Sequence, residues 1–230
     1  MRIVYVVISC IAVGLFGAMA IAKLPHALYG KRIAGQVVDA ETGAPIPGAH
    51  VAFLWESTII PSGFTGHNAR DICYHAAAAV TDPDGKFDVP GWRKWSTYNV
   101  YSMDPIAIVY VRNYQPLYQP VQLGPSTGPL EHPSERYGLK RFSGGVDDRM
   151  HALFRNLGNK VCDYGGQSQK SLYPMLKAVY AEAHEIAQSS EHKLTLDSIR
   201  WFAAYAGTAR RPGVPNEDAR TEAFIRKELQ

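Results

Sequence analysis

Two short patterns in the middle of the chain have the letters of a hydrolytic site. His132 and Glu135 are spaced as an H-x-x-E pair, and such a pair coordinates zinc only where both side chains are held rigidly. Residues 124–128 spell G-x-S-x-G, a pattern that places a serine nucleophile between a strand and a helix. Both patterns lie in a stretch of proline, glycine and serine without helical periodicity. We therefore predict no catalytic residue, no metal site and no cofactor.

A third pattern places acidic residues around a turn. Asp82, Asp84 and Asp88 bring three carboxylates into seven residues, and such a cluster can bind a hard cation such as calcium. Pro83 and Gly85 are, however, residues of a tight hairpin turn, in which Gly85 supplies the positive φ. A calcium loop also needs a terminal glutamate. The pattern favours a plain turn over a cation site.

Four aromatic residues form the candidate binding surface. Trp92, Trp95, Tyr98 and Tyr101 recur at intervals of three, and two basic residues lie between the tryptophans. Rings at such spacing on a loop can form a platform for sugar rings or peptides. The alternative is structural, because a tryptophan often closes one end of a small sandwich and basic side chains stack on exposed rings. The sequence favours the structural interpretation and keeps the binding surface as the second.

The N-terminal segment predicts the compartment. Arg2 is followed by an apolar run without any charge over residues 3–22, which is typical of an export signal. The run is also long enough to span a bilayer. Residues 1–22 are therefore predicted to be a cleaved signal peptide or an uncleaved anchor. In either case we expect the rest of the chain to be extracytoplasmic: periplasmic, secreted, or anchored to the inner membrane and facing the periplasm.

Two of the three cysteines lie outside that segment. Cys73 and Cys162 would face an oxidising compartment, and both lie where a strand or helix pattern begins. We predict that they form a disulfide. The alternative is a pair of unrelated buried thiols.

The composition indicates a folded chain with a packed core. Hydrophobic residues make up 46% of the 230 residues and charged residues 20%, which excludes a disordered protein. The 24 basic and 21 acidic residues leave a formal charge of +3, too small and too scattered for nucleic-acid binding. A protein or a cell-envelope glycan is the expected partner, with the membrane added if residues 1–22 remain attached.

Residues 31–123 have the pattern of a β-sandwich. Residues 33–51 contain two runs of β-branched residues around a turn-forming stretch. The alternation in residues 50–55 predicts a strand buried on one face, and residues 56–71 look like an exposed insertion. Further strands are expected at 74–81, 86–90, 106–111 and 118–123. About seven strands result, the number of a small Greek-key sandwich.

The C-terminal third changes its period. Residues 124–145 are predicted to be a linker, and residues 146–208 a helical appendage. Its strongest helix has apolar residues at spacings of three and four, namely Leu172, Leu176, Val179, Ala183 and Ile186. Short helices are not stable alone in water, so we expect the appendage to pack on one sheet of the sandwich. Residues 209–230 are predicted to be a tail with a frayed, charged helix.

Two segments of the sandwich region resemble a known family. An I-x-G-x-V-x-D strand runs into T-G-x-P-I-x-G-A-x-V, and A-x-T-D-x-x-G-x-F-x-x-P follows. The matching residues are Ile33, Gly35, Val37, Asp39, Thr42, Gly43, Pro45, Ile46, Gly48, Ala49, Val51, Ala79, Thr81, Asp82, Gly85, Phe87 and Pro90. This spacing is similar to the carboxypeptidase regulatory-like domain. The resemblance implies a mainly β fold, a seven-stranded Greek-key transthyretin-like β-sandwich with a small C-terminal α-helical appendage.

The resemblance covers less than half of the chain and implies little about activity, because this fold hosts many functions. It raises one alternative, an accessory or remnant module of a metallocarboxypeptidase-type hydrolase. That family's zinc site has a third histidine far beyond its H-x-x-E pair, whereas the last histidine here is His192. We therefore predict a non-enzymatic, extracytoplasmic β-sandwich module with a binding or scaffolding role.

Overall fold

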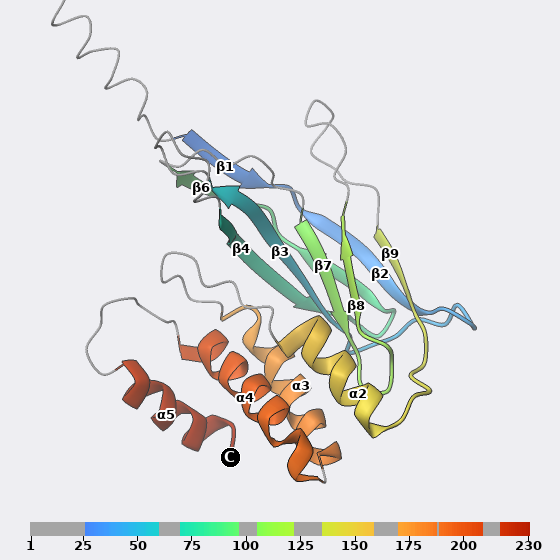
Figure 1. The fold of residues 1–230 in the computed structure, drawn as a ribbon. Helices are drawn as coiled ribbons and strands as arrows, with labels where there is room; N and C mark the ends of the chain where they lie inside the picture. Colours follow the sequence, from blue (N-terminus) through green and yellow to red (C-terminus); the bar gives the residue numbers. More distant parts are fainter. Residues whose placement is uncertain are drawn as a thin grey trace, which may run out of the picture.

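A computed structural model describes residues 26–59, 70–96, 105–121, 135–158, 170–187, 189–208 and 217–230. These residues form a mixed fold rich in sheet (Figure 1). The strands are β1 (His26–Gly30), β2 (Ile33–Asp39), β3 (His50–Ile59), β4 (Arg70–Val80), β5 (Lys86–Val89), β6 (Trp92–Ser96), β7 (Pro105–Tyr110), β8 (Leu117–Pro120) and β9 (Glu135–Leu139). The helical segments are α2 (Val146–Leu153), the π-helical turn η2 (Phe154–Gly158), α3 (Tyr173–Ile186), the 3₁₀ turn η3 (Ser190–His192), α4 (Lys193–Thr208) and α5 (Glu217–Glu228).

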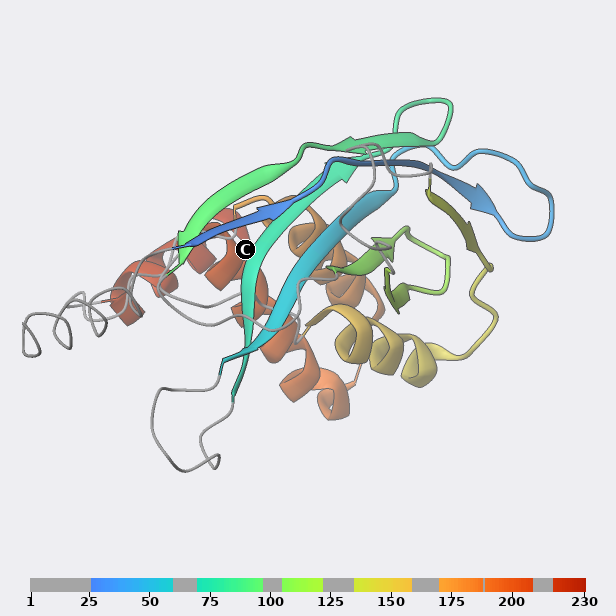
Figure 2. The ribbon, with the colours of Figure 1, turned by 90° about the horizontal axis from the view of Figure 1, so that it is seen from above.

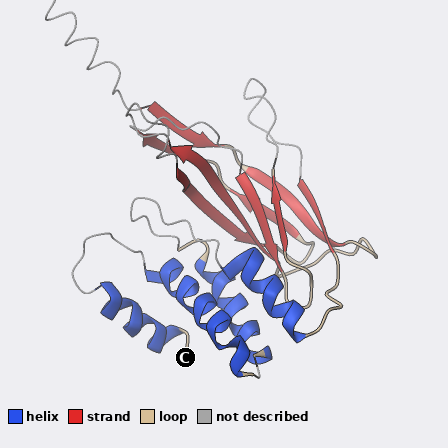
Figure 3. Cartoon of the chain, viewed as in Figure 1, coloured by secondary structure: helices blue, strands red, loops and turns tan. Residues whose placement is uncertain are grey.

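The described strands form three sheets instead of one seven-stranded sandwich. A four-stranded antiparallel sheet, in the order β4-β3-β7-β8, lies in the middle (Figures 1 and 2). One of its faces packs against the three-stranded sheet β5-β2-β9, and the other carries the helices (Figure 3). The other two described strands, β1 and β6, pair with each other in a separate two-stranded ribbon. The prediction of about seven strands was too low, and the helices form a full layer.

Strand β9 corrects the predicted linker. It lies within residues 124–145 and pairs with β2 in parallel, with Glu135 opposite Gly35. Tyr137 and Leu139 alternate with exposed residues and are buried, as in a strand with one covered face. A strand of five residues with a glycine has little intrinsic β propensity, and its partner lies about a hundred residues away in the chain. Local sequence patterns therefore miss it.

The central strand β3 is buried on both faces, which corrects the predicted one-sided burial. Val51, Phe53 and Trp55 point into the core between the two sheets, while Ala52 and Leu54 point into the core beneath the helices. Strand β7 alternates in the same way. A strand covered on both sides has a near-continuous apolar sequence, and residues 51–55 have one.

The helix layer uses the apolar stripe that the sequence predicts. Leu172, Leu176, Val179 and Ala183 are fully buried, and they pack in one core with the outer face of β3 and β7. Burial of one large aliphatic side chain contributes about 1.5–3 kcal/mol before conformational entropy is subtracted. Such a stripe is too costly to leave in water, and the four-stranded sheet offers the apolar face that covers it.

The C-terminal helix α5 is also packed, whereas the sequence predicted a frayed tail. Thr221, Ile225 and Leu229 are buried, and the Phe224 ring meets the Tyr173 ring edge-on with 5.4 Å between their centroids. Thr221, Ile225 and Leu229 follow a spacing of four along one narrow side of a segment that is otherwise charged. Because the segment has many charged residues, its short apolar side was not recognised from the sequence.

Candidate functional site

Strand β6 carries two of the four aromatic residues of the predicted binding surface. It pairs antiparallel with β1, so that Trp92 lies opposite Gly30 and Trp95 opposite Ala27. Tyr98 and Tyr101 lie outside the described residues. Because successive side chains of a strand point to opposite faces, the two tryptophans face opposite sides of the ribbon. They therefore have different roles.

Trp92 closes one end of the core. Its ring centroid lies 5.4 Å from that of Trp55 and 4.5 Å from that of His75. A Cβ atom added to Gly30 would come within 2.1 Å of the Trp92 Nε1 atom, so only glycine leaves room for the ring. Trp92 is thus a structural residue that fixes the ribbon to the sandwich.

Trp95 belongs to an exposed face of the same ribbon. Its side chain is 66% exposed, and the Arg93 guanidinium lies 5.2 Å from its ring centroid. Tyr29, opposite Arg93 in the register, is 51% exposed. We call Tyr29, Arg93 and Trp95 the outer ribbon face. It presents two aromatic rings and one permanent positive charge on a ribbon anchored by Trp92.

The chain around the outer ribbon face is basic. Residues 26–32 and 90–96 contain no acidic residue and four basic ones, namely Lys31, Arg32, Arg93 and Lys94. Arg32 forms an exposed ion pair with Asp88, at 2.6 Å between Nη2 and Oδ2. Lys94 is half-buried, and burial lowers its pKa. Arg93 is the basic side chain that lies beside Trp95.

His75 lies on β4 with its ring against Trp92, and its titration should make the stability of the fold depend on pH. Burial, and to a smaller extent the charge of Lys94, lower its pKa to about 4 from an ordinary 6.5. As the pH falls, His75 is therefore protonated in the unfolded chain at a higher pH than in the folded protein. Its contribution to the free energy of unfolding is complete above pH 6.5 and declines as the pH falls towards 4. We expect His75→Phe to flatten the fall of the melting temperature between pH 7 and 4. Equal slopes for both proteins would contradict this, and His50, whose pKa burial also lowers, accounts for a residual slope.

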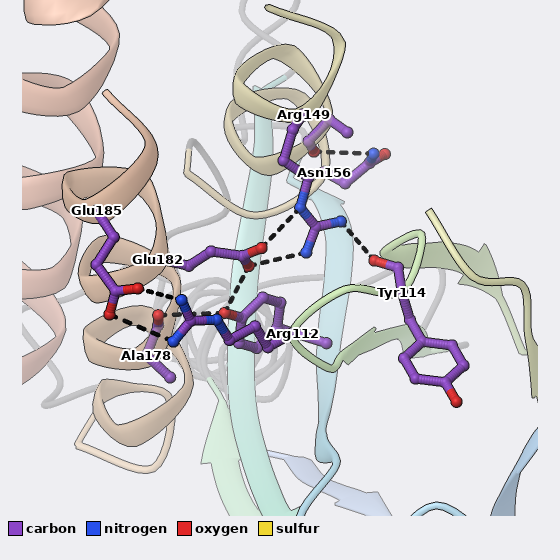
Figure 4. A network of polar contacts seen from close by, with 9 residues as sticks. Arg112, Tyr114, Arg149, Asn156, Ala178, Glu182 and Glu185 are labelled. Atoms are coloured by element: carbon purple, nitrogen blue, oxygen red, sulfur yellow. Dashed lines mark hydrogen bonds and ion pairs between the residues drawn. The ribbon is translucent and has the colours of Figure 1, made fainter. Parts of the chain in front are cut away.

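A buried ion pair joins the helices to the sandwich (Figure 4). Arg149 on α2 donates from Nε and Nη2 to the two carboxylate oxygens of Glu182 on α3, at 2.9 and 2.8 Å. Its Nη1 donates to the backbone oxygen of Tyr114, at 2.5 Å. The Tyr110 hydroxyl on β7 donates to Glu182 Oε2, at 2.9 Å. Two helices, one strand and one turn thus share a single cluster.

This cluster is closed to solvent and its charges satisfy each other. Arg149 and Glu182 are 5% and 4% exposed. Burial and the charge of Glu182 raise the pKa of Tyr110, which keeps its hydroxyl protonated and able to donate. These residues are not among those predicted from the sequence. The available signal was a glutamate at a position of α3 that continues the apolar stripe, three residues after Val179.

The Asp82 carboxylate of the acidic turn accepts hydrogen bonds from the backbone of its own turn. Asp82 Oδ1 accepts hydrogen bonds from the backbone N–H groups of Asp84, at 2.9 Å, and Lys86, at 2.8 Å. Gly85 has a φ of 71°, as predicted. In the described part of the chain, no three His, Cys, Asp or Glu side chains gather as a metal site. Glu135 lies in β9, whereas His132 and residues 124–128 are outside the described ranges.

Of the two cysteines predicted to form a disulfide, Cys73 lies in the described part of the chain. Cys73 lies on β4 and is half-buried against the helix-side core. Cys162 lies outside the described residues, so its pairing with Cys73 stays a prediction. Residues 1–22 also lie outside them, and none of the described helices has the length and apolar character needed to cross a membrane.

A groove of about 620 Å³ opens between α3, α4 and α5. Its lining includes two ion pairs, with Lys177 Nζ 3.8 Å from Glu228 and Arg200 Nη1 3.8 Å from Asp197, together with Lys193 and Glu185. These opposite charges give the groove no preference for an anion or a cation.

No family model and no curated protein matches the sequence. Among solved structures, a 3-chlorocatechol 1,2-dioxygenase from Rhodococcus opacus 1CP is similar over 49% of this chain and 61% of its own, at 16% identity and a TM-score of 0.29. A 9R-lipoxygenase from Cyanothece PCC8801 is similar over 68% of this chain and 24% of its own, at 12% identity and a TM-score of 0.22. Neither likeness is strong enough to carry an argument about fold or function.

Proposed function

We propose that this protein is an exported, non-enzymatic binding or scaffolding module of the cell envelope, built on a transthyretin-like sandwich of the carboxypeptidase regulatory-like type. The outer ribbon face is the observation that carries the proposal. Tyr29 and Trp95 expose aromatic rings next to Arg93. Exposed tryptophan, tyrosine and arginine are the side chains most enriched in the energetic centres of binding surfaces.

The sandwich motif supports the family assignment through the structural roles of its residues. The Asp39 carboxylate accepts hydrogen bonds at 3.0 Å from the N–H groups of Glu41 and Thr42, which closes the turn after β2. The buried Thr81 hydroxyl accepts from the N–H of Ala49 and donates to the Ile46 carbonyl, both at 2.8 Å. The motif thus specifies turns and not a reaction.

The packing of the sheet supports the scaffolding part of the proposal. The four-stranded sheet packs on both faces, and the hydrogen bond from Tyr110 on β7 to Glu182 on α3 links the helix layer to it. A binding face on such a body changes little in shape when a partner docks, which reduces the entropy lost on binding.

Two measurements test the proposal, the first of them for export. The full chain is fused in front of alkaline phosphatase, an enzyme that becomes active only where its disulfides form. We expect activity from the parent fusion. Gly14→Arg with Leu15→Arg places two charges in the apolar run and should abolish it. An inactive parent fusion would overturn the assigned location.

The second measurement tests binding through the outer ribbon face. A photo-crosslinking benzoylphenylalanine replaces Trp95 in one variant and Leu194, an 82% exposed residue on α4, in the other. Illumination of whole cells should join an envelope component to position 95 and not to position 194. Equal or absent crosslinking at the two positions would contradict a binding role for this face.

A further inference from the structure

The outer ribbon face lies close to the predicted membrane segment along the chain. The apolar run ends at Ala22 and β1 begins at His26, so only residues 23–25 separate them. Three extended residues span at most about 10 Å. Trp95 lies opposite Ala27, the second residue of β1. When the apolar run lies in a bilayer, Trp95 is therefore at the end of the ribbon nearest to the lipid.

The chemistry of the face matches the surface of a membrane. Tryptophan and tyrosine are enriched at the boundary between lipid and water, where an apolar ring can lie among headgroups. Basic side chains are attracted to anionic lipid headgroups. Tyr29, Trp95 and Arg93 combine both properties, and no acidic residue occurs in residues 26–32 or 90–96 to oppose them.

The orientation of the molecule is consistent with this contact. Figure 1 shows β1 and β6 on the side of the sheets away from the helices. Trp92 points from the inner face of the ribbon into the core, so Trp95 on the outer face points away from it. A bilayer beside the outer ribbon face leaves the helix layer directed away from the membrane.

We propose that the outer ribbon face docks on an anionic lipid surface and holds the sandwich against the membrane. The proposal rests on the exported, envelope-facing function above, and it names the lipid as the partner of that face. A protein partner for the same face is the competing outcome. The experiment below separates the two because it contains lipid and this protein alone.

The test measures whether the Trp95 ring touches lipid. The full chain is reconstituted into vesicles of phosphatidylethanolamine and phosphatidylglycerol whose acyl chains carry bromine near the headgroups. Bromine quenches tryptophan fluorescence on contact, and subtracting the emission of Trp95→Phe isolates the Trp95 signal. We expect strong quenching of Trp95. A Trp95 signal that bromine leaves unchanged would overturn the proposal.

Leu194 gives the matched control. Leu194→Trp in the Trp95→Phe background adds an exposed indole to the helix layer of the same anchored protein. We expect this indole to remain unquenched. Equal quenching at positions 95 and 194 would show non-specific contact with vesicles and would also overturn the proposal.

A charge variant tests the anionic part. Arg93→Gln should lower the ratio of docked to undocked ribbon about fivefold, since one basic side chain near an anionic surface is worth about 1 kcal/mol. Parent protein in phosphatidylcholine vesicles should show the same loss. Quenching of Trp95 that is reduced neither by Arg93→Gln nor by phosphatidylcholine vesicles would contradict the recognition of anionic lipid. If position 95 crosslinks to a protein in cells and is unquenched in vesicles, the lipid proposal fails while the binding function stands.

Discussion

Arg149→Ala should destabilise the fold by about 3–5 kcal/mol, because removal of one partner leaves the other as an uncompensated buried charge. The guanidinium holds both oxygens of Glu182 and the backbone oxygen of Tyr114, and neither charged side chain reaches solvent. For a domain of this size, each kcal/mol lowers the melting temperature by about 2–4 °C. Urea unfolding followed by circular dichroism measures the change in the free energy of unfolding.

A double substitution separates the ion pair from simple loss of packing. Arg149→Met with Glu182→Leu removes both charges and keeps most of the volume, so it should recover most of the stability that either single substitution loses. Tyr110→Phe removes one hydrogen bond to the charged Glu182 carboxylate and should cost about 1.5–3 kcal/mol. If the double variant loses as much as the two single variants together, the charges are not the cause.

The neighbouring pair of Arg112 and Glu185 gives an exposed control. The two side chains form an ion pair but are 55% and 53% exposed, so water and salt screen their attraction. Arg112→Ala should cost no more than about 1 kcal/mol. The contrast between the two pairs isolates burial as the source of the large effect.

Local patterns predicted the parts of the fold that neighbouring residues specify. The turn at Gly85 and the stripe of α3 appeared as expected, since a positive φ and a spacing of three and four are properties of short segments. Strand β9 was missed because, within the described residues, it pairs with β2 alone, which is far away in the chain. The two-sided burial of β3 likewise depends on which elements cover each face.

The candidate site was predictable in its residue types but not in its geometry. The spacing of Trp92 and Trp95 suggested one aromatic surface, yet a strand turns residues three apart to opposite faces. The helical register of Glu182 hinted at burial, whereas its partner Arg149 lies 33 residues away on another helix. A buried pair of this kind becomes visible only when the two helices have been placed on the sheet.

The second large effect concerns Cys73, which we expect to be bonded to Cys162. The separation of 162 − 73 = 89 residues corresponds to roughly 4–5 kcal/mol in the loop-entropy model, an upper figure that strain reduces. The fold places Ser171 against β4. Ser171, nine residues after Cys162, donates from Oγ to the backbone oxygen of Ala76, at 3.1 Å, and Ala76 lies three residues after Cys73 on the same strand.

Peptide mapping of the exported protein under denaturing conditions without reductant is the direct measurement, and it should recover a peptide with Cys73 joined to one with Cys162. Cys73→Ser and Cys162→Ser should each lose stability, and the double variant should lose much less than the sum of the two, because both single variants remove the same bond. Ser171→Ala is the matched control and should cost no more than about 1 kcal/mol, since it removes a single exposed hydrogen bond. Two free thiols would show that the covalent link between sandwich and helix layer does not exist.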